Sequence, residues 1–384
     1  MFFIQLLAAT IKPINMDERN QNSPSRRDFL KKSSLAGIGL TAALLSSCSD
    51  EAKAEKENKE LGNVNDSSKM LMSQFGLEYP IFQAAPGGED LAIAVANAGG
   101  MGALSLGWYS PEESYEKVLK VKKATKGNFY ANYVLHLGTD SLDKALEAGC
   151  PTIQFSWGIP KAEMVKRIRA ANARLGIQVG SKLNTKMAME HSPDFLICQG
   201  LEAGGHNQGT SYIADVLAEV VETANGVPVL VAGGISTGHD MRKVMHQGAA
   251  GVVMGTRFIA TKESDAHELY KKRLVEAGEK STVYTNCFNL EWNAMHRVLR
   301  NDTFNKWEAQ GCPLADNKPG EGDIVATHPV WGPVKRYSLG SPFPDMTGNV
   351  EDMAMYAGEG VSRVNEILSA SKLIGRIWQE FENK

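Results

Sequence analysis

Several kinds of chemistry are excluded by what the sequence contains little of. Only five of its 384 residues are cysteines, with no C-x-x-C pair and none at metal-ligand spacing from a histidine. This argues against a zinc site and against a dithiol redox centre. Basic residues are not in excess, because 41 lysines and arginines face 44 acidic residues and the formal net charge is -3. Such a chain has no positive field with which to bind nucleic acid.

The composition that remains is that of a folded protein. Hydrophobic residues make up 43% of the chain and charged residues 22%, which is ordinary for a globular domain. The 37 glycines predict many tight turns between strands and helices. The length suits a single α/β barrel, which needs about 250 residues before insertions.

The first part of the chain has the features of a targeting signal. "SPSRRDFLKKSSLAGIGLTAALLSSCSD", residues 23–50, runs from an arginine pair through an apolar stretch to small residues and Cys48. "SRRDFLK" resembles the twin-arginine export motif, and "LSSC" resembles a lipobox whose cysteine carries lipid. The alternative is a short buried helix after a chance arginine pair. Residues 1–15 add nothing that the signal needs, so either Met1 or Met16 fits as the initiator.

These features predict export by the twin-arginine machinery and a location in the periplasm or cell envelope. Residues 1–48 are interpreted as the signal peptide with its lipobox, and residues 49–69, which are polar and charged, as a flexible tether. Lipid on Cys48 would then attach the protein to a membrane without a spanning helix.

The rest of the chain alternates apolar runs with amphipathic stretches, as repeated βα units do. Eight strands are predicted, at 81–85, 101–106, 129–135, 152–157, 177–183, 195–200, 227–234 and 251–260. Helices are predicted between them, including 111–124 with Pro111 in its first turn and 160–176 ended by Gly176. Cys198, inside the sixth apolar run, is predicted to pack in the core.

Eight such units favour a closed (β/α)8 barrel, the TIM-barrel architecture, over an open doubly wound sheet. Residues 70–278 are assigned to this barrel. Residues 279–384 break the pattern and are predicted to pack on the barrel as a partly irregular segment that covers its mouth and ends in a helix over 352–381. In such a barrel the carboxyl ends of all strands meet at one face, where active sites lie.

Small residues end the seventh and eighth predicted strands. "VAGGIS" contains Gly234, and "VVMGTRF" contains Gly255 and Thr256. At these two strand ends barrels commonly bind phosphate through backbone N–H groups, which a side chain would hold away. The alternative is a pair of tight turns without a ligand. Because the two are adjacent, they favour a phosphorylated cofactor.

The loop "QGLEAGGHNQG", residues 199–209, follows the sixth strand. The Gln199 amide is able to hydrogen-bond to the polar edge of a heteroaromatic ring, and Gly204 lets the backbone approach a flat ligand. His206 follows where an imidazole with a pKa near neutrality would exchange a proton with a substrate. A solvated loop histidine is the alternative for His206, and Glu202 is either functional or else a surface carboxylate or a helix-end charge.

This loop resembles the signature of the nitronate monooxygenase family, formerly called 2-nitropropane dioxygenases. The similarity covers about residues 70–370 and includes "YPIFQAA", "NAGGMGALSLGWYSPEE", "VPVLVAGGIS", "GAAGVVMGTRFIATKES" and "YAGEGVSRV". The resemblance implies an FMN-dependent barrel that oxidises alkyl nitronates with O2, by single-electron transfer, to carbonyl compounds and nitrite.

The resemblance also assigns roles to residues. His206 falls on the catalytic histidine, which would deprotonate a neutral nitroalkane and steady the oxygens of a bound nitronate. The FMN-binding pattern falls on Ala85, Asn132, Gln199, Gly204, Gly234, Val253, Met254, Gly255 and Thr256. No metal site is predicted.

Two segments depart from the family pattern near the expected mouth. They are "QAAPGGED" after the first strand and "EWNAMHRVLRN", which replaces a "GRPARxLRN"-like segment. Two other functions stay open. One is an NAD(P)H-dependent flavin reductase of the enoyl-thioester or quinone reductase type on the same barrel, which export would disfavour because little NAD(P)H is found outside the cytoplasm. The other is a surface-attached binding protein without catalysis.

Overall fold

The computed structural model describes residues 64–383. The predicted signal peptide, Cys48 and most of the predicted tether lie outside these residues. Helix α2 (Asp66–Phe75) begins within the range expected to be tether, so residues 66–69 are helical instead. None of the helices from residue 64 onward is both long and apolar enough to cross a bilayer.

Eight parallel strands form the barrel in the order β1-β9-β8-β6-β5-β4-β3-β2. Their bounds are β1 Ile81–Gln83, β2 Gly102–Ser105, β3 Phe129–Val134, β4 Thr152–Ser156, β5 Arg174–Val179, β6 Phe195–Gln199, β8 Val229–Ala232 and β9 Gly251–Met254. A parallel bridge between Phe82 and Met101 brings β1 against β2, with the Gln83 N–H donating to the Met101 carbonyl at 2.9 Å. The predicted closed barrel and its eight units are confirmed.

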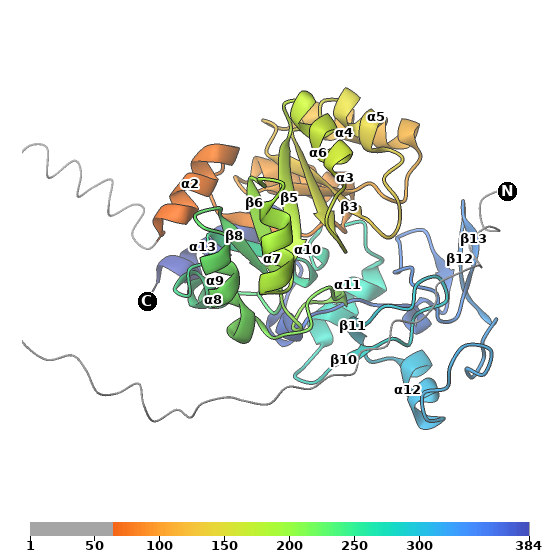
Figure 1. Ribbon diagram of the computed structural model, residues 1–384. Coiled ribbons are helices and arrows are strands. Elements are labelled where there is room, and N and C mark those ends of the chain that lie inside the picture. The colour runs from red at the N-terminus through yellow and green to blue at the C-terminus, as the bar shows by residue number, and fades with distance from the viewer. Residues whose placement is uncertain (1–63, 384) are drawn as a thin grey trace, which may run out of the picture. The chain divides into compact units, whose positions relative to one another are not determined.

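Helices follow the strands and cover the barrel (Figure 1). They are α3 Gly88–Asn97, α4 Pro111–Ala124, α5 Leu142–Glu147, α6 Ala162–Ala170, α7 Lys182–Met189, α8 Ile213–Thr223, α9 Gly238–Met245, α10 Thr256–Ile259 and α11 Glu268–Glu276. Helix α4 begins as predicted, because Pro111 follows Ser110, whose side chain accepts from the Glu113 N–H in a capping box.

Apolar side chains fill the barrel and the layer between its strands and helices. Inside the barrel, Phe82 packs edge-on against Phe195 with ring centroids 5.5 Å apart, and Phe75 of α2 packs against the same Phe195. Cys198 is fully buried among apolar neighbours, as predicted. Because strands of a closed parallel barrel are buried on both faces, they are read from the sequence as continuous apolar runs.

The fifth predicted strand was misplaced, and Phe195 gives the reason. Residue 176 was expected to end a helix, but Gly176 lies within β5, and a Cβ there would be 2.2 Å from the Phe195 ring. The glycine makes room for this ring. Residues 182–183, predicted as strand, begin helix α7, which Ser181 caps.

The last part of the chain was also predicted wrongly in two places. The eighth strand stops at Met254, because Gly255 and the helix α10 follow. The helix expected over 352–381 is confined to α13 (Ala370–Glu382), capped by Ser369. Instead, two short 3-10 helices, η1 (Val350–Asp352) and η2 (Glu359–Arg363), lie within residues 350–363 and are separated by irregular backbone.

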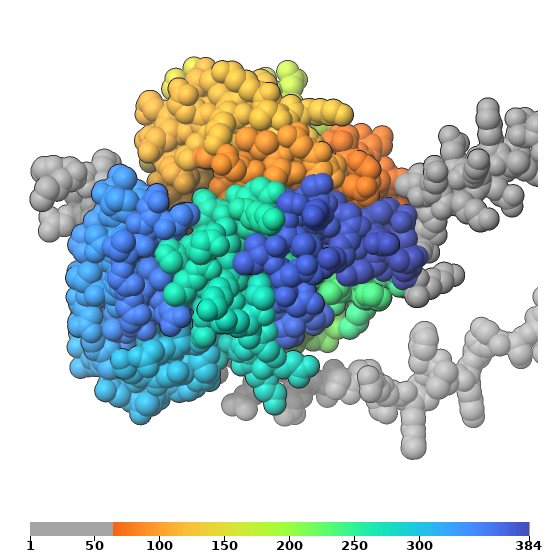
Figure 2. All heavy atoms as spheres, turned by 180° about the vertical axis from the view of Figure 1, so that it is seen from behind, coloured from red at the N-terminus to blue at the C-terminus, as the bar shows by residue number. Residues whose placement is uncertain are grey.

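Two small sheets complete the structure. β7 (Gly205–His206), from the loop after β6, pairs with β11 (His296–Leu299), which pairs with β10 (Thr282–Thr285). The second sheet contains β12 (Ile324–His328), β13 (Gly332–Lys335) and β14 (Thr347–Gly348), and α12 spans Asp302–Ala309. In Figure 2 the residues of the C-terminal segment (279–384), teal to blue, form a continuous surface with the orange residues of the first βα units.

Candidate active site

The predicted site residues lie at the carboxyl ends of the barrel strands. Ala85 follows β1, Asn132 lies in β3, and Gly255 and Thr256 follow β9. In the register of the sheet Gln199 of β6 is beside Ala232 of β8, which is beside Val253 of β9. One face of the barrel therefore carries residues from widely separated parts of the sequence.

The loop after β6 is tied to its own strand by Gln199. The Gln199 Oε1 accepts from the backbone N–H of Gln208 at 2.7 Å and of Gly209 at 3.4 Å. Its Nε2 donates to the His206 carbonyl at 3.3 Å. These bonds fix the backbone from the carbonyl of the histidine to Gly209. In this arrangement Gln199 is a positioning residue for His206.

Two further side chains in the loop have structural partners. Asn207 Nδ2 donates to the carbonyls of Gly200, Leu201 and Ala203. The Glu202 carboxylate accepts from the Ile213 N–H at 3.0 Å, so it caps helix α8, and burial raises its pKa. Glu202, which the sequence left undecided, is therefore a helix-end charge.

Residues 357–360 connect the glycines of two loops with Thr256. The Gly358 N–H donates to Thr256 Oγ1 at 3.0 Å, and a Cβ on Gly204 would be 2.5 Å from the Gly358 nitrogen. A Cβ on Gly360 would be 2.6 Å from the Gly234 carbonyl oxygen. Gly204, Gly234 and Thr256 thus surround one backbone segment that the sequence analysis had placed in a helix.

The other predicted residues join this group less directly. A Cβ on Gly255 would be 3.4 Å from the Ala84 Cβ, so Gly255 is next to the end of β1 and close in sequence to Ala85. Asn132 Nδ2 donates instead to Gln154 and, at 3.3 Å, to Ser156 Oγ, both on β4. Val253 and Met254 are buried.

His206 lies among aromatic rings from residues 279–384. Its backbone pairs with His296 of β11. Its Nε2 atom is buried and has no hydrogen-bond partner among residues 64–383. Burial, with a contribution from the neighbouring His296, lowers the pKa of His206 to about 3. The imidazole is therefore neutral near neutral pH, which corrects the expectation of a pKa near neutrality.

His296 is neutral for the same reason, and its tautomer follows from its bonds. Its Nδ1 is 2.9 Å from the Ala294 carbonyl and its Nε2 accepts from the Phe288 N–H, so Nδ1 carries the proton. Burial lowers the pKa of His296 to about 4.

Aromatic rings that the sequence analysis did not single out cover His206. The indole of Trp292 stacks on the His206 ring with centroids 4.5 Å apart, and Tyr356 is 5.4 Å away. Trp292 also stacks on His136, and Trp157 lies edge-on to it. Trp292 and His296 both belong to "EWNAMHRVLRN", the segment that departs from the family pattern, and this departure was the available signal.

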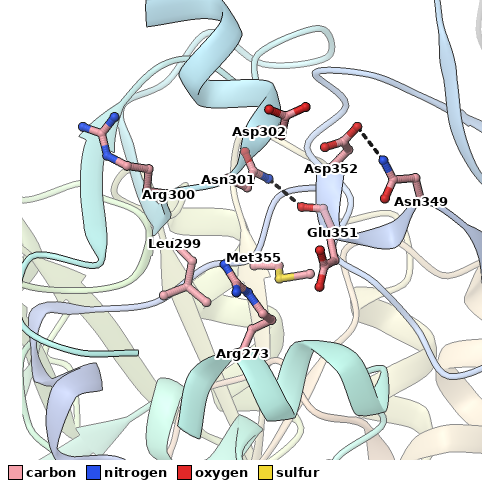
Figure 3. Close-up of a pocket in the computed structure, with 9 residues that line it drawn as sticks. All are labelled: Arg273, Leu299, Arg300, Asn301, Asp302, Asn349, Glu351, Asp352 and Met355. Atoms are coloured by element: carbon pink, nitrogen blue, oxygen red, sulfur yellow. Dashed lines mark hydrogen bonds between the residues drawn. The ribbon is translucent and has the colours of Figure 1, made fainter. Parts of the chain in front are cut away.

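Two cavities in the described part of the chain differ in their relation to this site. One of about 620 Å³ is lined by Glu202, Gly233, Gly234, Lys243, Lys280 and Arg363, among others, and so reaches one of the predicted glycines. The other, of about 280 Å³, lies between Arg273, Asn301 and Glu351 and contains none of the predicted site residues (Figure 3). The first cavity adjoins the candidate site.

The two buried imidazoles make a testable prediction about pH. Below pH 6.5 the unfolded chain binds protons at His206 and His296 that the folded chain takes up only near pH 3 and 4. The contribution of these two imidazoles to the free energy of unfolding is thus fully present above pH 6.5. It falls as the pH drops, by about 1.4 kcal/mol per pH unit for each imidazole. Urea unfolding between pH 7.5 and 5 checks this. His206→Gln should weaken the dependence and the exposed His239→Gln should not; equal slopes in all three proteins would contradict the assignment.

Comparison with known proteins connects this site to a family. The sequence profile described as "Nitronate monooxygenase" matches residues 68–380. A probable nitronate monooxygenase from Staphylococcus saprophyticus is 28% identical over 269 residues, covering 57% of this chain and 76% of the relative. A (3aS,4S,5R,7aS)-5-hydroxy-7a-methyl-1-oxo-octahydro-1H-indene-4-carboxyl-CoA dehydrogenase from Mycobacterium tuberculosis is 32% identical over 247 residues, covering 62% and 68%.

Solved structures share the fold. FabK from Thermotoga maritima superimposes with a TM-score of 0.68 at 26% identity, covering 81% of this chain and 95% of that one. Nitroalkane oxidase from Streptomyces ansochromogenes superimposes with a TM-score of 0.64 at 23% identity, covering 79% and 96%. The family profile covers most of the chain and the whole barrel. The chain therefore belongs to the nitronate monooxygenase family and is an oxidoreductase on a (β/α)8 barrel.

Proposed function

We propose that this protein is an FMN-dependent oxidoreductase that oxidises alkyl nitronates with O2 to carbonyl compounds and nitrite. The observation that carries the proposal is His206, a neutral imidazole with a buried, unpartnered Nε2 at the barrel mouth of a nitronate monooxygenase family member. A buried polar atom without a partner is rare in folded proteins, and a bound ligand is one reason for it.

The residues at the mouth fit an FMN molecule. Gly233 and Gly234 have φ angles of 130° and 70°, which glycine adopts without strain. Their backbone, the Gly255 backbone and the Thr256 hydroxyl would hold the phosphate. Thr256 Oγ1 already accepts from Gly358, so its proton is free to be donated to a phosphate oxygen.

The chain's own residues would then bind and orient the substrate. When bound, the flavin supplies the electron acceptor for the nitronate carbon. His206, neutral and desolvated, offers one hydrogen bond to a nitro oxygen and is a weak base. Gln199 holds the His206 backbone through the bond to its carbonyl. A site with a weak base favours a substrate that is already an anion, which supports nitronates over neutral nitroalkanes.

A second candidate is an NAD(P)H-dependent flavin reductase acting on an acyl thioester or quinone. The relative from Mycobacterium tuberculosis, named as a carboxyl-CoA dehydrogenase, favours this alternative because it is 32% identical to the chain. The proposed location disfavours it. With Arg26, Arg27 and Cys48 as export and lipid-attachment residues, the mature protein would be anchored in the cell envelope, away from cytoplasmic NAD(P)H.

Cofactor analysis and one anaerobic assay distinguish these functions. The purified protein is expected to be yellow and to release one FMN on denaturation, identified by chromatography. Under anaerobic conditions propionate 3-nitronate should bleach the flavin absorbance and NADH should not. Folded protein that takes up no flavin would contradict the proposal, and rapid bleaching by NADH alone would favour the reductase.

A further inference from the structure

The ring of Trp292 stacks on the rings of two histidines at the mouth. Its centroid is 4.8 Å from that of His136 and 4.5 Å from that of His206, and both imidazole planes are within 16° of the indole plane. Trp157 closes the edge, with its ring at 69° to the indole. We call the three rings of His136, Trp292 and His206 the Trp292 stack.

Bonds to neighbouring residues hold the loop that carries this indole. Asn286 and Asn289 both donate to the Asn293 Oδ1 at 3.2 Å. The buried Lys318 donates to the Cys287 carbonyl at 2.9 Å, and Glu291 accepts from the Leu339 N–H at 2.8 Å. The indole is therefore presented by a braced loop, which limits how far it moves aside.

The position of the indole limits what reaches His206. Trp292 covers one face of the imidazole that would contact the substrate, so a large substituent on the substrate carbon would compete with the indole for this face. We propose that Trp292 is a specificity-determining residue that restricts the site to nitronates with small alkyl groups. This inference rests on the proposed nitronate oxidation and goes beyond it, because it names the size class of the substrate and the residue that selects it.

Removing the indole should change the selection in a defined direction. Trp292→Ala leaves a slot against the two imidazoles on which the indole stacks, and a flat aromatic ring would take the place of the indole in it. A nitronate with a phenyl group should then bind better, while a small alkyl nitronate, which does not use the slot, should gain nothing. Trp292→Phe keeps a smaller stacked ring and should lie between the wild type and the alanine variant.

The test compares propane-1-nitronate with the nitronate of phenylnitromethane in the FMN-loaded enzyme. Trp292→Ala should raise the ratio of kcat/KM for the phenyl substrate to that for the propyl substrate by about tenfold or more, mostly through KM. Trp331→Ala is the matched control, because Trp331 also stacks on a histidine, His328, at 3.8 Å but in the exposed β12–β13 region. A ratio that stays within about twofold of the wild type in Trp292→Ala would overturn the inference.

A second measurement does not depend on turnover. Titration with benzoate, a flat anion that is not oxidised, followed by ¹⁵N NMR of histidine-labelled protein, should show about tenfold tighter binding to Trp292→Ala than to wild type or Trp331→Ala. Equal benzoate affinities would overturn the inference. If the wild type oxidises neither nitronate, the proposed function fails, and the benzoate titration still decides whether Trp292 closes the slot.

Discussion

Replacing His206 with alanine is expected to lower kcat/KM for a neutral nitroalkane by about 100-fold, the lower end of the range of general-base catalysis, because His206 is a weak base. For a preformed nitronate the loss should be only about tenfold, since one hydrogen bond to a charged group is removed and no base is needed. Steady-state rates with nitroethane and ethyl nitronate measure both. The FMN content should not change, because the cradle for the phosphate lies at Gly234, Gly255 and Thr256.

Comparing the nitroalkane with the nitronate separates a role of His206 as a base from a role in binding. Equal losses on nitroalkane and nitronate would show that His206 does not act as the base, and full activity on both would remove it from the mechanism. The exposed His239→Ala serves as the control. The pH profile adds a further check. Because the pKa of His206 is lowered to about 3, kcat/KM for the nitroalkane should stay flat from pH 8 to 5 and not fall below pH 6.5.

Replacing Gly234 with alanine is expected to weaken FMN binding by about tenfold or more, a cost of about 1.4 kcal/mol. Gly234 has a φ of 70°, at which an L-residue is strained by about 1–2 kcal/mol. The added Cβ would also be 3.2 Å from the Glu202 Cβ, so the loop must shift. Fluorescence titration of the apoprotein with FMN gives the dissociation constant.

Gly226→Ala is the matched control for this prediction. Gly226 has a φ of 92°, and a Cβ there would meet nothing within 4 Å. Both variants should lower Tm through the same backbone strain, but only Gly234→Ala should lose affinity for FMN. An unchanged dissociation constant in Gly234→Ala would remove this glycine from the cofactor site.

The sequence predicted the barrel because its signals are local. Each buried strand is a continuous apolar run, and helix starts such as that at Ser110–Pro111 are specified by residues adjacent in the sequence. Once the barrel was predicted, the candidate site residues could be grouped, because parallel strands bring their carboxyl ends to one face. The family signature around His206 then indicated the chemistry.

Errors arose where a distant residue decided the local structure. Gly176 was interpreted as a helix end, but it is a strand residue that makes room for the ring of Phe195. Residues 357–360 were expected to be helical, but they form a segment against Gly204 and Thr256. Neither contact is visible in the residues that flank these positions.

The sequence by itself thus determined the fold, the family and the identity of the histidine at the mouth. Only the tertiary structure decided that this histidine is neutral, because its pKa depends on burial under Trp292, Tyr356 and His296, which are 86 or more residues away along the chain. Desolvation depends on all the residues that pack around a group, including those distant in the sequence. A local sequence pattern identifies the group but not these residues.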